Sequence, residues 1–111
     1  MARLRITTHR PRSGVVCVAL SGDLDMSSAY RLDEELRSIE HTGPDTVVVD
    51  LRELVFMDSA GLSRLLAAHK RARRGGWRFG LTRGPAAVER MLRMTVSGER
   101  FLTLPDPATT A

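Results

Sequence analysis

The stretch "DTVVVDLRELVFMDSAGLSRLLAAHKRARRGG" (residues 45–76) decides the fold, because its hydrophobic pattern changes halfway along. Its first part contains the continuous apolar run "TVVVDL" (46–51), which is typical of a strand buried on both faces. Its second part begins near Ser59, repeats apolar residues at helical spacing and ends at Gly75-Gly76. The stretch therefore predicts a strand followed by a helix, the repeating unit of an α/β fold.

The rest of the chain continues this alternation. A turn at 11–14 predicts a hairpin between the first two strands, and repeated strand–helix alternation predicts parallel strands. We expect one α/β domain over residues 1–111, with a mixed, mostly parallel sheet, the order ββαβαβαβ, helices packed on the sheet and a frayed tail at 105–111. The other predicted strands are 4–7, 14–22, 77–82 and 101–104, and the other helices start at Ser27 or Ser28 and at Pro85. The predicted inward positions are Ala29, Leu32, Leu36 and Ile39, then Leu62, Leu65, Leu66 and Ala72, then Val88, Met91, Leu92 and Thr95.

Composition narrows the class of protein. Hydrophobic residues make up 42% of the 111 residues and charged residues 27%, which is typical of a soluble globular protein. The sequence contains no apolar run of about 18 residues and no signal-peptide pattern at its start, so we expect a cytoplasmic protein without a membrane partner. The single cysteine, Cys17, lies in an apolar run, which predicts a buried thiol and excludes an internal disulfide.

The positive charge raises the question of a nucleic-acid partner. The formal net charge is +4, but the basic residues are spread along the chain. The densest cluster lies at a predicted helix end, where cations complement the helix dipole and are expected to be solvated. Aromatic residues are only 5% of the chain, too few for a base-stacking platform. We therefore predict no direct nucleic-acid binding; the cluster consists of Lys70, Arg71, Arg73 and Arg74.

Functional residues of parallel sheets gather at the carboxyl ends of the strands, in the loops that lead to helices. Two predicted loops carry acids there: residues 21–25, with Asp23 and Asp25, and residues 56–59, with Asp58. Three carboxylates could converge, but the spacing and closing glutamate of an EF-hand are missing. We predict no metal site.

Ser59 does not fit a catalytic serine. A hydrolase elbow reads G-x-S-x-G, and here the leading glycine is replaced by Met57. A nucleophilic serine also needs a base, but His69 lies about 15 Å farther along the same predicted helix. His9, His41 and His69 are each interpreted as surface residues. The glycines and the lysine of a nucleotide-binding P-loop are also missing from this turn, so we predict neither enzyme activity nor a cofactor.

Two interpretations of Ser59 stay open from the residues alone. Serine at a helix start can cap a free backbone N–H group, which stabilises a helix by about 1 kcal/mol. A cap does not explain Asp58, the small residues Ala60 and Gly61, or an expected exposed Leu62, and glycine in a first turn costs about 0.5–1 kcal/mol relative to alanine. The alternative is a docking site where another protein must approach closely.

The same residues resemble a known family. The stretch "VVVDLRELVFMDSAGLSRLLAAHKRARRGG" (47–76) resembles the signature of anti-sigma factor antagonists, the STAS domain family, with its Asp-Ser-Ala-Gly-Leu core after a buried strand. The segments "VALSGDLDMSSAYRLDEEL" (18–36) and "LTRGPAAVERMLRMTVSGERFLTL" (81–104) are similar to the flanking elements of the family. The resemblance extends from about Leu4 to Leu104.

The resemblance implies a switch. In this family an anti-sigma factor that is also a serine kinase binds the unphosphorylated antagonist and thereby releases a sigma factor for transcription. Phosphorylation of the serine ends binding, and a metal-dependent serine/threonine phosphatase restores the active form. An alternative is a docking module that is not phosphorylated and belongs to a larger signalling assembly.

Carried onto this chain, the resemblance makes Ser59 the phosphorylated residue. Ser63 offers a second hydroxyl one helical turn away, where the family is expected to have a small residue such as glycine. A helix N-terminus should tolerate the added phosphate through its dipole and its free N–H groups, so the fold is expected to survive modification. The resemblance places the partner-binding residues at Asp23, Asp25, Asp58, Ser59, Ala60, Gly61 and Leu62.

Overall fold

The computed structural model describes residues 2–93 and 102–104. Their elements follow the predicted order ββαβαβαβ, which is confirmed. The elements are β1 (Arg5–Arg12), β2 (Val15–Leu24), α1 (Ala29–Glu40), β3 (Thr46–Met57), α2 (Ser59–Gly75), β4 (Arg78–Thr82), α3 (Ala86–Arg93) and β5 (Leu102–Leu104).

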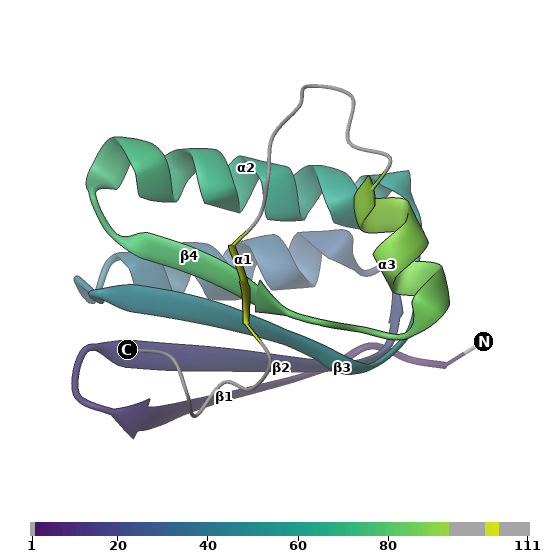
Figure 1. Ribbon diagram of the computed structural model, residues 1–111, viewed down its shortest axis with the longest axis horizontal. Coiled ribbons are helices and arrows are strands. Elements are labelled where there is room, and N and C mark those ends of the chain that lie inside the picture. The colour runs from purple at the N-terminus through teal and green to yellow at the C-terminus, as the bar shows by residue number, and fades with distance from the viewer. Residues whose placement is uncertain (1, 94–101, 105–111) are drawn as a thin grey trace.

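The strands form one mixed sheet in the order β1-β2-β3-β4-β5. The hairpin of β1 and β2 is antiparallel, as predicted, and the other three neighbouring pairs are parallel. Helices α1 and α2 lie side by side over one face of the sheet, and α3 lies near the start of α2 (Figure 1). Within the described chain, no helix is long and apolar enough to cross a membrane.

The core lies between these two helices and the sheet. The four inward residues predicted for α1 are all buried. Of the four predicted for α2, Leu62, Leu65 and Ala72 are buried and Leu66 is half-buried. They pack against alternate residues of the central strands, Val16, Val18 and Leu20 from β2 and Val47, Val49 and Leu51 from β3. Cys17 has no exposed surface, which confirms the buried thiol.

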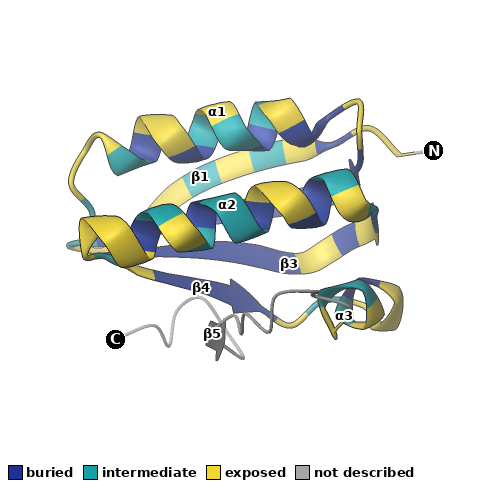
Figure 2. Cartoon of the chain, turned by 90° about the horizontal axis from the view of Figure 1, so that it is seen from above, coloured by how far each residue is buried: buried dark blue, intermediate teal, exposed yellow. Residues whose placement is uncertain are grey.

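The central strands β2 and β3 are longer than predicted, so the acids expected in two loops lie in a strand or directly after one. Strand β3 continues to Met57 and β2 to Leu24, so most of the two predicted loops is strand. The ends of the two strands pair with each other, from Ser21 opposite Glu53 to Leu24 opposite Met57, with one register shift before this run and one within it. This pairing satisfies backbone groups that a loop would have left to water. Figure 2 shows the result: β3 is buried in its first half and largely exposed near its end.

Other element boundaries differ by a few residues. Strand β1 covers Arg5–Arg12 instead of 4–7, because its later residues also pair with β2. Helix α2 ends as predicted, with Gly76 in the left-handed conformation at φ 85°. Helix α3 begins after Pro85 and buries Val88, with Met91 and Leu92 half-buried. Thr95, Phe101 and the tail 105–111 lie outside the described residues.

The basic cluster at the end of α2 is not uniformly solvated, which corrects the prediction for one member. Arg71 is 16% exposed and forms a two-pronged ion pair with Glu40 of α1, at 2.7 Å and 3.0 Å. Lys70, Arg73 and Arg74 are exposed as expected. One of the predicted surface histidines, His69, is half-buried with its ring centroid 6.3 Å from that of Phe79.

A buried acid links β3 to β4. Asp50 Oδ1 accepts hydrogen bonds from the backbone N–H of Arg52 and from the hydroxyl of Thr82, which in turn accepts one from the N–H of Leu51. The Arg52 guanidinium also donates to both carboxylate oxygens. Burial opposes the charged form of this carboxyl, but the hydrogen bonds from Arg52 and Thr82 outweigh it and lower the pKa of Asp50 from its ordinary value.

Asp50→Asn is expected to make the free energy of unfolding less sensitive to acid. A carboxyl whose pKa is lower in the folded than in the unfolded protein stabilises the fold above its unfolded pKa, near 4, and loses this contribution as pH falls through the folded pKa. Urea unfolding should therefore show a larger loss from about pH 5 to about pH 2 in the wild type than in the variant. Parallel pH profiles for the two proteins would contradict this assignment.

Candidate functional site

The candidate site lies at the end of the sheet where β2 and β3 finish and where α1 and α2 begin (Figure 1). Leu24, the last residue of β2, pairs with Met57, the last residue of β3. Ser59 is the first residue of α2 and is exposed. Its side chain makes no hydrogen bond with the part of the chain that the structure describes. The pairing of the two strand ends thus holds a free hydroxyl at a fixed position.

The helix cap is Asp58 and not Ser59, so the capping interpretation of Ser59 is wrong. Asp58 Oδ1 accepts hydrogen bonds from the backbone N–H groups of Ala60, at 2.9 Å, and Gly61, at 3.1 Å. Aspartate is among the preferred N-cap residues for this reason. Because Asp58 caps the helix, the Ser59 hydroxyl is not needed to hold the start of α2.

Asp58 also joins the two loops of the site. Its second carboxylate oxygen, Oδ2, accepts a hydrogen bond of 3.1 Å from the backbone N–H of Met26, in the turn before α1. Its own N–H donates to the carbonyl of Leu24, at 3.2 Å. The starts of both helices are therefore tied together through one residue.

Gly61 and Leu62 face the protein's own interior. Leu62 is only 8% exposed, which confirms its predicted inward position and shows that the expectation of an exposed apolar side chain there is wrong. A Cβ atom built on Gly61 would lie 2.8 Å from both the Cγ atom and the carbonyl oxygen of Leu24. The close approach that requires glycine is made by β2 and not necessarily by a partner.

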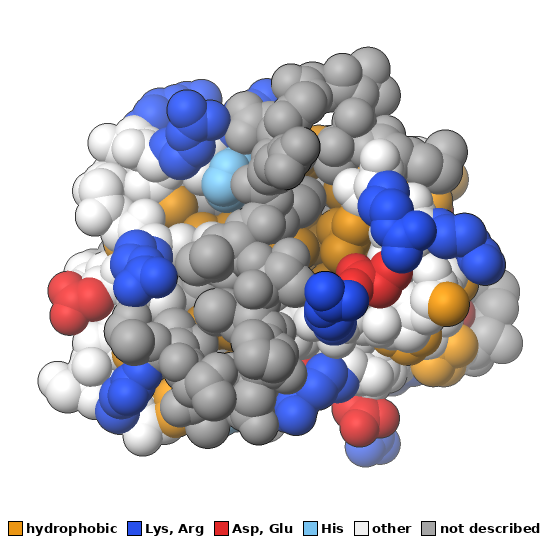
Figure 3. Space-filling model, in the orientation of Figure 1, with side chains coloured by type: hydrophobic (Ala, Val, Ile, Leu, Met, Phe, Trp, Pro, Cys, Tyr) orange, Lys and Arg blue, Asp and Glu red, His pale blue; other side chains and the backbone are white. Residues whose placement is uncertain are grey.

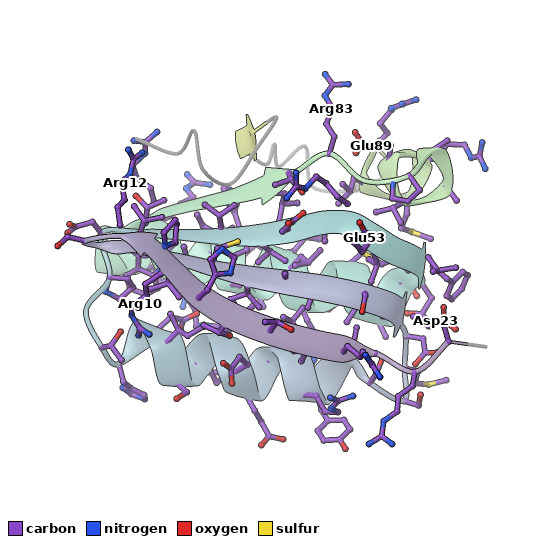
Figure 4. The ribbon with its side chains drawn as sticks, turned by 90° about the horizontal axis from the view of Figure 1, so that it is seen from below. Arg10, Arg12, Asp23, Glu53, Arg83 and Glu89 are labelled. Carbon is purple, nitrogen blue, oxygen red and sulfur yellow. The ribbon has the colours of Figure 1, made fainter. Side chains whose placement is uncertain are left out.

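Asp23 holds the N-terminal segment in place. It is 7% exposed; its Oδ2 accepts a hydrogen bond from the backbone N–H of Ala2, and its own N–H donates to the Ala2 carbonyl. Gly22 has φ 89°, and a Cβ there would meet the carbonyl oxygen of Arg3. Figure 4 shows Asp23 and Glu53 toward the end of the sheet that carries the site, with Arg10 and Arg12 toward the opposite end.

Asp25 organises the turn between β2 and α1. Its Oδ1 accepts hydrogen bonds from the N–H and the hydroxyl of Ser27, at 2.9 Å and 2.7 Å, and lies 3.2 Å from the Ser28 hydroxyl. These bonds, first of all the one from the Ser27 hydroxyl, lower the pKa of Asp25 against the opposing effect of burial. Ser28 occupies the N-cap position of α1, but its side chain makes no cap bond and instead accepts from the N–H of Asp25. Asp23 and Asp25 thus hold the backbone of the site in place through hydrogen bonds within the protein.

The structure brings the three acids to one end of the sheet but does not arrange them around an ion. Among the described residues, no group of three or more His, Cys, Asp or Glu side chains could hold a metal ion. Ala60 is half-buried beside Ser59, and Ser63 is exposed on α2.

Exposed apolar side chains near the start of α2 are not among the predicted site residues. Met26 is 82% exposed, Val55 62% and Phe56 48%, and among the described residues Tyr30 is the only other large hydrophobic side chain that is exposed. We call Met26, Val55 and Phe56 the apolar surface. Simple strand alternation does not predict this surface, because it would bury one of Val55 and Phe56. A register shift opposite Gly22 and Asp23 leaves Val55 as an extra residue of β3, and both side chains are exposed.

Comparisons with known proteins match this arrangement. The family model described as "Mlab, STAS domain" matches residues 8–102. The anti-sigma F factor antagonist of Paenibacillus polymyxa is 33% identical over 99 residues, covering 84% of this chain and 78% of that protein. The chain spans about half the length of other curated relatives that it matches.

Solved structures show the same fold. An anti-sigma factor antagonist from Mycobacterium paratuberculosis superposes with a TM-score of 0.80 and 28% identity, covering 94% of this chain and 87% of that one. The phosphorylated form of the Bacillus cell fate determinant SpoIIAA superposes with a TM-score of 0.70 at 17% identity, covering 90% and 91%. These likenesses confirm the predicted α/β fold class with its mixed sheet. Because the family model and the Paenibacillus antagonist both cover most of the sequence, the chain belongs to the STAS domain family.

Proposed function

We propose that this protein is an anti-sigma factor antagonist whose binding is switched off by phosphorylation of Ser59. The unphosphorylated form binds an anti-sigma factor with serine kinase activity and so releases a sigma factor. A metal-dependent serine/threonine phosphatase removes the phosphate. The observation that carries the proposal is the exposed, uncommitted hydroxyl of Ser59, held at the start of α2 by the Asp58 cap.

The position of Ser59 suits a kinase substrate. Its side chain is exposed and the backbone around it is fixed by bonds that do not involve the hydroxyl, so a kinase can reach it without opening the core. The relatives support the same role, since one is named an anti-sigma F factor antagonist and SpoIIAA has been solved with and without phosphate. Ser63 is also exposed but lies inside the helix, which makes it the second candidate acceptor.

The apolar surface is the proposed contact for the partner. Met26 belongs to the turn that Asp58 holds, and Val55 and Phe56 belong to the end of β3 that leads to Ser59. Exposed apolar side chains that gather at one end of a protein indicate a protein–protein contact, whereas single ones do not. We propose that the partner also contacts Ser59 and the half-buried Ala60. The remaining predicted contact residues are mostly buried and act by holding the backbone of the site; these are Asp23, Asp25, Asp58, Gly61 and Leu62.

The surroundings of Ser59 support a role in protein binding and not in catalysis. His69, half-buried against Phe79, lies more than two helical turns from Ser59, so it cannot activate the hydroxyl. Lys and Arg side chains on the face seen in Figure 3 are scattered and do not form one continuous patch, which favours a protein partner over a nucleic acid. We propose a protein that acts in the cytoplasm as one STAS domain over residues 1–111, without membrane contact.

Phe56→Ser is expected to weaken binding to the anti-sigma kinase by roughly 5- to 150-fold, corresponding to about 1–3 kcal/mol for a truncated interface aromatic. The partner is first captured with Ser59→Ala as bait and identified as an ATP-binding anti-sigma factor, and each variant is then titrated into it by calorimetry.

Tyr30→Ser is the matched control, because Tyr30 is 53% exposed but lines a separate groove between α1 and β1 with Ile6, Thr8 and Glu34. It should bind as the wild type does. Equal losses in the two variants would show that the partner does not select the apolar surface. A bait that retains only proteins without kinase activity would favour a docking module that is not phosphorylated.

A further inference from the structure

The start of α2 has few free donors, contrary to the expectation that it could hold a phosphate. A helix start normally leaves backbone N–H groups without partners, and such groups bind anions. Here the Ala60 and Gly61 N–H groups donate to Asp58 Oδ1, and the Asp58 N–H donates to the Leu24 carbonyl. The N–H of Ser59 is the one group of this set for which the structure shows no acceptor among the described residues. A carboxylate of the protein already occupies the anion position.

The Asp58 carboxylate is also fixed from its other side. Its Oδ2 accepts the Met26 N–H at 3.1 Å, so a displaced carboxylate would leave an N–H of the neighbouring turn without its partner as well. A phosphate on Ser59 would thus have to break both hydrogen bonds of Asp58 Oδ1 before it could bind the two helix amides, and full displacement of the carboxylate would also break the bond from Met26.

We infer that Asp58 is a positioning residue: its carboxylate excludes the phosphate of phosphorylated Ser59 from the helix N-terminus and directs it into solvent, beside the apolar surface. The inference rests on the proposed function, in which Ser59 is phosphorylated. An excluded phosphate keeps its charge where a partner meets it, whereas a phosphate bound by the helix would be partly neutralised. Asp58 therefore has two roles: it caps α2, and it strengthens the effect of phosphorylation on partner binding.

The effect can be measured through the second ionisation of the phosphate, which has a pKa near 6 in free phosphoserine. An adjacent negative charge favours the singly charged phosphate and raises this pKa, whereas amide donors favour the doubly charged form and lower it. Other charged side chains from elements near this end are the same in each variant, so a comparison of variants isolates Asp58. These groups are Asp23 and Asp25 with Arg3 and Arg31, which line one hollow with them, Glu53 on β3, Arg64 on α2, and Arg83, Glu89, Arg90 and Arg93 from the α3 region.

The test uses full-length protein with phosphoserine incorporated at position 59 during synthesis, so that no kinase is needed. Phosphorus NMR titration should give a phosphate pKa that is higher in the Asp58 protein than in Asp58→Asn by about 0.5 pH unit, the effect of a unit charge about 6 Å away in water. Asparagine keeps a capping oxygen and removes the charge, which makes it the matched control. In Asp58→Ala the freed amides should bind the phosphate, which lowers its pKa and raises the melting temperature on phosphorylation by about 2–6 °C.

Amide spectra provide the second readout. In the Asp58 protein the Ala60 and Gly61 N–H signals should not follow the phosphate titration, and in Asp58→Ala they should. The inference is overturned if the phosphate pKa with Asp58 is equal to or below that in Asp58→Asn, or if the two amides follow the phosphate in the Asp58 protein. If Asp58→Ala does not fold, the Asp58→Asn comparison decides alone. Failure of every anti-sigma kinase to modify Ser59 would contradict the proposed function but would leave these results unchanged.

Discussion

Phosphorylation of Ser59 is expected to weaken binding to the anti-sigma kinase by roughly 30- to 1,000-fold, which corresponds to a loss of about 2–4 kcal/mol. The modification adds about −1.5 to −2 charges at neutral pH and a bulky group next to Asp58. Met26 and Phe56 are exposed at the end of the sheet where α2 begins, so a phosphate on Ser59 would be desolvated if the kinase docks on this end. The fold itself should persist, because the Ser59 hydroxyl makes no hydrogen bond with the described residues of the core.

The measurement is calorimetric titration of each form into the kinase, with thermal unfolding as a folding control. Ser59→Ala should bind as tightly as the wild type and gain no phosphate when incubated with the kinase and ATP. Ser59→Asp should bind poorly, although aspartate carries less charge than phosphate and its loss should lie toward the lower end of the range. Ser63→Ala is the matched control one turn along α2 and should still be phosphorylated.

Two outcomes would contradict parts of this prediction. Binding of the phosphorylated and unphosphorylated proteins within threefold of each other would refute the switch. Phosphate found on Ser63 instead of Ser59 would keep the switch and move its acceptor.

Much of the fold follows from local patterns in the sequence. The spacing of Ala29, Leu32, Leu36 and Ile39 alone predicts the buried face of α1, since each helical turn brings one of them to the same side. The valine-rich first half of β3 likewise predicts a strand buried on both faces. Such features need only neighbouring residues, so the element order could be predicted without knowledge of the tertiary structure.

The details of the site depend on contacts between distant residues, which local patterns do not contain. The pairing of Leu24 with Met57 extends both strands through segments whose mixed composition indicates loops. The same pairing brings the Met26 N–H to Asp58 and assigns the cap to that residue. Ser59 could be located from its motif, but whether its hydroxyl or the Asp58 carboxylate caps α2 could be decided only once the two loops were placed together.

The role of Gly61 also depends on a contact with a distant residue that the sequence does not reveal. Its place in the motif suggests that a partner must approach closely, and on that view Gly61→Leu would keep the fold and weaken docking. The structure instead places Leu24 against it, with 2.8 Å between a built Cβ and both the carbonyl oxygen and the Cγ atom of Leu24. The backbone oxygen cannot turn away as a flexible side chain could, so the helix and β2 would have to separate.

Gly61→Leu is therefore expected to destabilise the domain by about 3 kcal/mol, the upper part of the usual range for an overpacked core, even though leucine favours helix more than glycine does. Gly61→Ala should lose less, about 1 kcal/mol, because one added carbon needs a smaller shift and alanine gains helix propensity. Urea unfolding followed by circular dichroism measures both losses. Ser63→Leu is the matched control, since it adds the same side chain two residues later on the exposed side of α2 and should change stability by no more than about 0.5 kcal/mol. If Gly61→Leu is instead as stable as the wild type but no longer binds the kinase, the close contact at Gly61 belongs to the partner and not to Leu24.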